Sequence, residues 1–178
     1  MNLTDSKQNL WKTMNNEFKT SIKQNILKAI INEKDKSVRF SYCEAIAKVV
    51  ENIFDLEDDD NNEEFNDLNI YLFNVLNKCS IDESNLLEVE TALVILSKVF
   101  GFIYEKIGDK LNVLVNSFKV YFKSESMSIR TKTTQVLTEI YSIVKKKDAK
   151  KFKDFMFNIL ETCLKCMENP KEEANVSF

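Results

Sequence analysis

The fold is decided by residues 36–52, which read KSVRFSYCEAIAKVVEN. Apolar side chains recur there at the spacing of one face of an α-helix. The pattern predicts a helix that begins near Ser37, a candidate N-cap, and ends near Phe54. The chain of 178 residues has only 2 Gly and 1 Pro, too few for the tight turns of an all-β sandwich or barrel. The sequence therefore predicts an all-α protein.

The same helical periodicity continues on both sides of this segment. It predicts helical pairs at 16–54, 63–103 and 109–145, a half repeat at 148–168 and a polar tail at 171–178. The break inside each pair is short, so its two helices must be antiparallel neighbours. The pairs recur about every 40–47 residues, the period of HEAT and armadillo repeats. We expect one segment over 1–178, an α-solenoid of about three and a half HEAT-type hairpins with seven main helices.

A short motif recurs where two second helices of a pair begin. Residues 37–39 are Ser-Val-Arg and residues 128–130 are Ser-Ile-Arg, which predicts a serine N-cap followed by an apolar residue and a basic one. The helix expected after Ser84, a further candidate N-cap, has no basic residue in this place. In HEAT repeats such an arginine can contact the adjacent repeat, so Arg39 and Arg130 are candidates for an inter-repeat ladder. Solvated surface is the alternative for both.

The overall charge argues against several classes of partner. The chain has 25 Lys and Arg against 28 Asp and Glu, a formal net charge of -3. This balance predicts no direct nucleic-acid partner. No apolar stretch reaches the roughly 18 residues that a membrane span needs, and residues 1–10 lack the apolar core of a signal peptide. We therefore expect no membrane partner and a location in the cytoplasm and nucleus.

The chain has no pattern that predicts catalysis, a metal site or a cofactor. It has no His, the commonest general base, and no Gly-rich phosphate loop. Its cysteines are Cys43, Cys79, Cys163 and Cys166, and each lies in an apolar helical pattern typical of a buried thiol. Cys163 and Cys166 form one Cys-x-x-Cys pair, which is too few ligands for a structural zinc site. We predict that the protein is not an enzyme.

Residues 10–173 resemble the N-terminal region of karyopherin-β (importin-β type) nuclear transport receptors. The resemblance is closest to the karyopherin beta-3 branch, which imports ribosomal proteins among other cargo. It rests on the order and spacing of four segments, namely 36–52, 87–100 (LEVETALVILSKVF), 128–131 (SIRT) and 151–155 (KFKDF). Receptors of this family have many more repeats and often carry Pro in the first helix of a repeat. We therefore expect the chain to be a fragment that starts after the family's first repeat.

The resemblance implies a segment of a nuclear import receptor. Such a receptor holds cargo on its concave face, releases it when Ran-GTP binds, and contacts FG nucleoporins through its outer helices. A HEAT-repeat scaffold of another type, such as a phosphatase regulatory subunit or a vesicle adaptor, stays open because periodicity cannot separate the two. The acidic stretch 55–64 has two interpretations. It could attract basic, ribosomal-protein-like cargo, or it is an insertion between repeats.

The resemblance also points to a partner-binding face. In such solenoids the second helix of each pair lines the concave surface, so the polar residues opposite its apolar stripe are candidates for contacts with Ran or cargo. Solvated surface is the alternative for each, because few interface residues carry much of the binding energy. The candidates are Ser41, Glu44, Lys48, Glu51, Thr91, Lys98, Lys132, Gln135 and Glu139.

Overall fold

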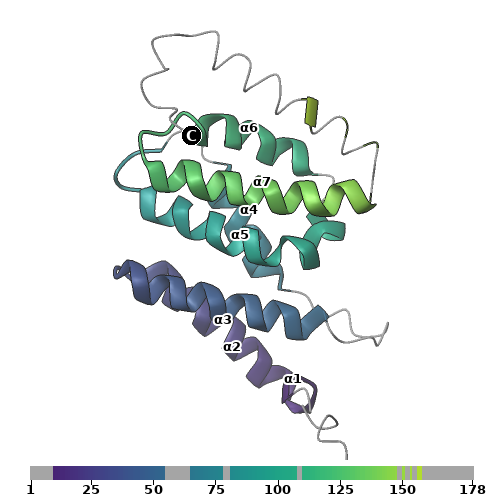
Figure 1. Ribbon diagram of the computed structural model, residues 1–178. Coiled ribbons are helices and arrows are strands. Elements are labelled where there is room, and N and C mark those ends of the chain that lie inside the picture. Colours follow the sequence, from purple (N-terminus) through teal and green to yellow (C-terminus); the bar gives the residue numbers. More distant parts are fainter. Residues whose placement is uncertain are drawn as a thin grey trace, which may run out of the picture. The chain divides into compact units, whose positions relative to one another are not determined.

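The structure of the chain is a computed structural model that describes residues 10–54, 65–77, 81–107, 110–147 and positions 150, 153, 156 and 157. Every regular element in these residues is an α-helix (Figure 1), which confirms the all-α prediction. The elements are α1 (Leu10–Thr13), α2 (Asn16–Asn32), α3 (Lys36–Phe54), α4 (Asn66–Leu76), α5 (Leu86–Ile107), α6 (Leu111–Tyr121) and α7 (Met127–Lys147).

The number of helices agrees only in part with the prediction. The described residues contain six of the seven main helices expected, α2 to α7, and a helix of 4 residues, α1, that the periodicity did not indicate. The expected seventh helix at 148–168 lies outside the described residues apart from four helical positions. The acidic stretch 55–64 and the tail 171–178 also lie outside them. One continuous solenoid over 1–178 stays a prediction.

The chain divides into two compact units, Met1–Leu72 and Phe73–Phe178. In the first unit, α2 packs against α3. Asn15 caps α2, because its side-chain oxygen accepts a hydrogen bond of 2.8 Å from the backbone N–H of Phe18. The hairpin needs a buried apolar face on each helix, and the buried apolar residues are Leu27 and Ile30 on α2 and Cys43, Ile46, Val49, Val50 and Ile53 on α3.

The apolar residues of α2 that recur at helical spacing form a stripe wider than its buried face. Phe18 is 55% exposed and Ile31 is 50% exposed, although both follow the same helical spacing as Leu27 and Ile30. Periodicity shows which residues can share a face, but the area covered by neighbouring elements decides how much of that face is buried.

In the second unit, α7 packs along α5 and also contacts α6 (Figure 1). A methyl group added at Gly101 of α5 would lie 3.3 Å from the Cδ1 atom of Ile143, so glycine permits a close approach of α5 and α7 there. The hydroxyl of Tyr121, at the end of α6, donates a buried hydrogen bond of 2.8 Å to the backbone carbonyl of Leu76. These contacts hold the helices of this unit in a fixed register.

The N-caps lie two residues before the serines that the sequence suggested. Asp35 accepts from the N–H of Val38 at 2.9 Å. Asp82 accepts from the backbone N–H groups of the two residues at 84 and 85, at 2.9 and 3.2 Å, and Ser126 accepts from residue 129 at 3.4 Å. Ser37, Ser84 and Ser128 are therefore not the caps.

Successive residues among Asp35, Asp82 and Ser126 are about 44–47 residues apart, which lies within the period of HEAT and armadillo units. Asp35 and Ser126 directly precede α3 and α7, whereas Asp82 caps a turn at 83–85 that leads into α5. The repeat unit is therefore a helical hairpin of HEAT-like length.

Candidate functional site

Arg39 closes the hairpin formed by α2 and α3. Its side chain is buried, with 6% of its surface exposed. Its Nε atom donates to the carbonyl of Glu33 at 2.7 Å, and Nη2 donates to the same carbonyl and to that of Ile31 at 3.3 Å. Carbonyls at the end of a helix have no partner within the helix, and a cation there also interacts favourably with the helix dipole. The arginine therefore satisfies the end of α2 from the first turn of α3.

Arg130 makes the equivalent contact in the hairpin formed by α6 and α7. Its Nη1 atom donates to the carbonyls of Ser124 at 2.6 Å and Glu125 at 3.1 Å. In both hairpins the arginine reaches a carbonyl six residues earlier in the chain. The observed bonds lie within one hairpin, so we name this arrangement the arginine clasp. A ladder between adjacent repeats stays a prediction.

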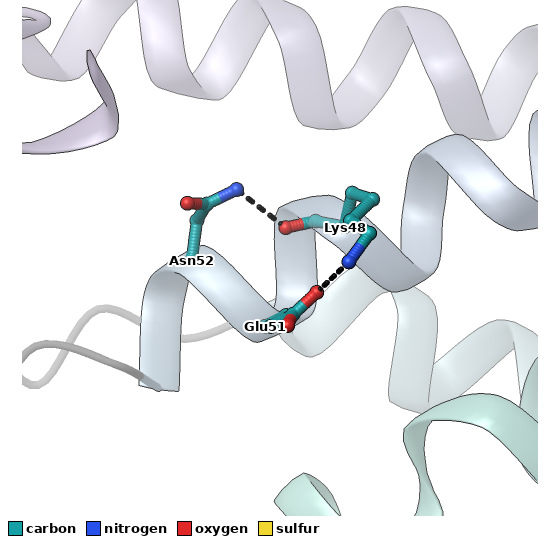
Figure 2. Close-up of polar contacts among 3 residues, drawn as sticks. All are labelled: Lys48, Glu51 and Asn52. Atoms are coloured by element: carbon teal, nitrogen blue, oxygen red, sulfur yellow. Dashed lines mark hydrogen bonds and ion pairs between the residues drawn. The ribbon is translucent and has the colours of Figure 1, made fainter. Parts of the chain in front are cut away.

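The polar face of α3 is partly neutralised by its own residues. Lys48 forms an ion pair with Glu51, and Asn52 donates to the carbonyl of Lys48 at 2.7 Å (Figure 2). Glu44 and Ser41 are exposed, and the hydroxyl of Ser41 donates to the helix backbone. The structure thus brings Lys48 and Glu51 together on an accessible side of α3, where an exposed pair contributes little to stability.

The prediction for Thr91 is wrong. Its side chain is fully buried, and its hydroxyl donates to the carbonyl of Leu87 at 2.6 Å. Every residue from Val89 to Leu96 on α5 is buried. A helix that is apolar around most of its circumference is enclosed by its surroundings, so α5 has no polar face at this point. Lys98, which follows Thr91 by about two helical turns, is exposed.

The remaining candidates lie together on α7. Gln135 and Glu139 are exposed, and Lys132 is half-buried. Gln135 points away from the buried face of α7, and Lys132 and Glu139 lie beside that face, which consists of Ile129, Thr133, Val136, Ile140 and Val144. These candidates belong to the second unit and those on α3 to the first, so a single surface formed by both groups stays a prediction.

Glu90 and Ser128 form a contact that the sequence reasoning missed. Glu90 is 3% exposed and accepts a hydrogen bond from the hydroxyl of Ser128, which joins α5 to α7. A buried carboxylate needs such a partner, because burial without one is strongly unfavourable. The available signal was the presence of two acidic residues, Glu88 and Glu90, inside the otherwise apolar run at 86–96 (LLEVETALVIL).

The described residues contain no group of three or more acidic or sulfur-containing side chains placed to hold a metal ion. Cys43 is buried with its thiol directed at the carbonyl of Arg39, 3.3 Å away, whereas Cys79, Cys163 and Cys166 lie outside the described residues. In the same part of the chain, no helix combines the length and the apolar character needed to cross a bilayer.

Capped helical hairpins at HEAT-like spacing, with exposed polar sides on α3 and α7, define an all-helical repeat protein of the α-solenoid type. A family model described as "IPO5-like, TPR repeats" matches residues 34–177. The chain therefore belongs to this family, within the importin-β/karyopherin receptors, which are transport proteins and not enzymes. Neither the curated proteins nor the solved structures contain a match to the chain. The cap spacing is longer than the period of about 34 residues that is typical of TPR units and closer to that of HEAT units.

Proposed function

We propose that the chain is a segment of a nuclear import receptor that binds protein cargo and Ran-GTP and passes through nuclear pores by contacting FG nucleoporins. The family match over 34–177 carries this proposal. The receptor moves between cytoplasm and nucleus and acts by binding alone. Its hairpins provide the rigid framework that such binding needs, because elements held by caps and clasps present side chains in fixed positions.

The exposed polar sides of the second helices form the proposed contacts with Ran and cargo. Side chains on a helix supported by a packed hairpin lose little further freedom when a partner binds, which favours affinity. Thr91 is not among the contacts because it is buried. The proposed contacts are Ser41, Glu44, Lys48 and Glu51 on α3, Lys98 on α5, and Lys132, Gln135 and Glu139 on α7.

The proposal extends to the karyopherin beta-3 branch and to basic, ribosomal-protein-like cargo. Two features of the sequence support it. The segments 36–52 and 87–100 resemble that branch, and the acidic stretch 55–64 complements a basic partner. Attraction of this kind mainly raises the association rate and weakens with salt.

The test is binding of the whole chain to Ran loaded with GTP or GDP, measured by biolayer interferometry. We expect tighter binding of the GTP form, and binding of FG-repeat peptides in a parallel measurement. Equal affinity for both nucleotide states, together with no FG binding, would contradict the receptor function.

A matched pair of variants locates the contact. Glu44→Lys reverses one charge on α3, and Glu17→Lys makes the same change on α2. Both side chains are exposed. We expect Glu44→Lys to weaken binding of Ran-GTP or of a basic ribosomal protein about tenfold, as for a charge at the centre of an interface, and Glu17→Lys to leave both unchanged. Equal effects of the two variants would remove α3 from the proposed face.

A further inference from the structure

The second helices α3 and α7 correspond residue by residue. Arg39 and Arg130 form equivalent clasps and are 91 positions apart, and the caps Asp35 and Ser126 are separated by the same number. Each residue of α3 therefore has an equivalent on α7 that lies 91 positions later. Equivalent positions of a repeat protein normally have equivalent neighbours, so a difference in burial marks a surface that can accept one.

One flank of α3 is more exposed than the equivalent flank of α7. Val38 is 42% exposed, whereas its equivalent on α7, Ile129, is fully buried. Two further residues follow on the same side of α3, at a spacing of four and three, and both are half-buried, although their equivalents, Thr133 and Val136, are fully buried. We call these residues of α3 the open flank, which consists of Val38, Tyr42 and Ala45.

On α7 the equivalent flank is covered by α5. The two helices pack along each other (Figure 1). Near the start of α7 the hydroxyl of Ser128 donates to the buried carboxylate of Glu90, and near its end Ile143 lies against Gly101. Ser128 and Ile143 project from the same side of α7 as Val136. The cover of this flank is thus an apolar helix with one buried carboxylate that bonds to a serine.

Ser37 is the equivalent of Ser128 and lies next to the open flank. It directly precedes Val38, as Ser128 precedes Ile129, and its side chain is exposed. By this equivalence its hydroxyl can donate to a carboxylate on a helix laid over the open flank. A hydrogen bond to a charged group is stronger than one between neutral groups and fixes geometry as well, so it would set the register of that helix.

A helix on the open flank would leave the polar side of α3 accessible. On α7, Gln135 and Glu139 are exposed although α5 covers the neighbouring flank. Their equivalents on α3 are Glu44 and Lys48, which are also exposed. The open flank and the proposed contacts with Ran and cargo are therefore separate surfaces of one helix.

We propose that the open flank of α3 binds the second helix of another hairpin of this repeat type, laid on α3 as α5 lies on α7, with a carboxylate of that helix bonded to Ser37. The equivalence with α7 selects this occupant, because it specifies both the apolar contact and the polar one. This assembly goes beyond the proposed function, since it requires neither Ran nor cargo.

The test uses the whole chain and a fluorescein-labelled peptide with the sequence of residues 82–100, which comprise the capping turn and the first part of α5. Fluorescence anisotropy measures its binding. The flank of α7 is already covered by the α5 of the same chain, which has the advantage of a high effective concentration. The free peptide therefore reports on the open flank.

A matched pair of variants locates the bound peptide. We compare Val38→Asp with Val113→Asp, because both valines are 42% exposed and each is the third residue of its helix, α3 or α6. We expect Val38→Asp to weaken binding about tenfold or more, since it buries an unpaired charge under the peptide, and Val113→Asp to change it by less than about twofold. Circular dichroism verifies that both fold, and Val38→Thr is a milder change should Val38→Asp fail. Equal losses in the two variants would overturn the proposal.

The bond to Ser37 is tested by combining Ser37→Ala in the chain with Glu90→Gln in the peptide. We expect each change to weaken binding about fivefold, and the two together hardly more than one, because both remove the same bond. Additive losses, or equal binding of a peptide with the same residues in scrambled order, would contradict the proposed geometry. Dimerisation of the unaltered chain that Val38→Asp abolishes would make a second copy of the chain the occupant and would also overturn the proposal.

Discussion

The hairpins α2–α3 and α6–α7 share one framework and differ in the surface they present. Each begins its second helix with a side-chain cap, Asp35 or Ser126, and each has an arginine that bonds to carbonyls six residues earlier. The polar residues on their second helices differ, with Glu44, Lys48 and Glu51 on α3 and Lys132, Gln135 and Glu139 on α7. The repeated residues hold the hairpin together, and the variable residues are available for recognition. This division is what a repeat scaffold with several partners requires.

The largest effect is expected from Arg39→Met, because it removes a buried clasp. The carbonyls of Glu33 and Ile31 lose their partner, and an unsatisfied buried polar group costs about 1–3 kcal/mol. We expect the free energy of unfolding of the first unit to fall by about 2–3 kcal/mol, measured by chemical denaturation and by hydrogen exchange at the end of α2. Lys28→Met, which removes an exposed charge from α2, is the control and should have little effect. A loss no larger than that of the control would mean that the clasp does not stabilise the hairpin.

Arg39→Lys tests whether the forked shape of the arginine group stabilises the hairpin in addition to its charge. A single ammonium group cannot reproduce the fork with which Nε and Nη2 contact one carbonyl. We expect Lys to recover less than half of the stability lost in Arg39→Met.

Arg130→Met should have a smaller effect than Arg39→Met, although the two arginines make equivalent bonds. Arg130 is only half-buried, so water can replace it at the carbonyls of Ser124 and Glu125. We expect a loss of about 1 kcal/mol and faster hydrogen exchange at the N-terminus of α7. If Arg130→Met were as damaging as Arg39→Met, burial would not be the property that separates the two clasps.

The sequence predicted the helical pairs and singled out both arginines, because apolar periodicity and a repeated motif are local signals. It did not predict the burial of Thr91 or the bond between Glu90 and Ser128. Both depend on the covering of α5, where every residue from Val89 to Leu96 is buried and the apolar pattern indicates no exposed side. The positions of the caps were also missed by two residues, because capping depends on the backbone conformation at the turn, which apolar periodicity does not report.

The smallest effects are expected from changes to the caps of the two hairpins, α2–α3 and α6–α7. Asp35 lies 2.9 Å from the N–H of Val38, whereas Ser126 lies 3.4 Å from that of Ile129. Hydrogen bonds weaken with distance, so Asp35→Ala should reduce stability by about 1 kcal/mol and Ser126→Ala by roughly 0.5 kcal/mol. Thermal denaturation of both variants, with Ser142→Ala as an exposed control on α7, measures the difference. The reverse order would show that the first hairpin depends on its clasp and the third on its cap, and the two frameworks would then share residues without sharing the source of their stability.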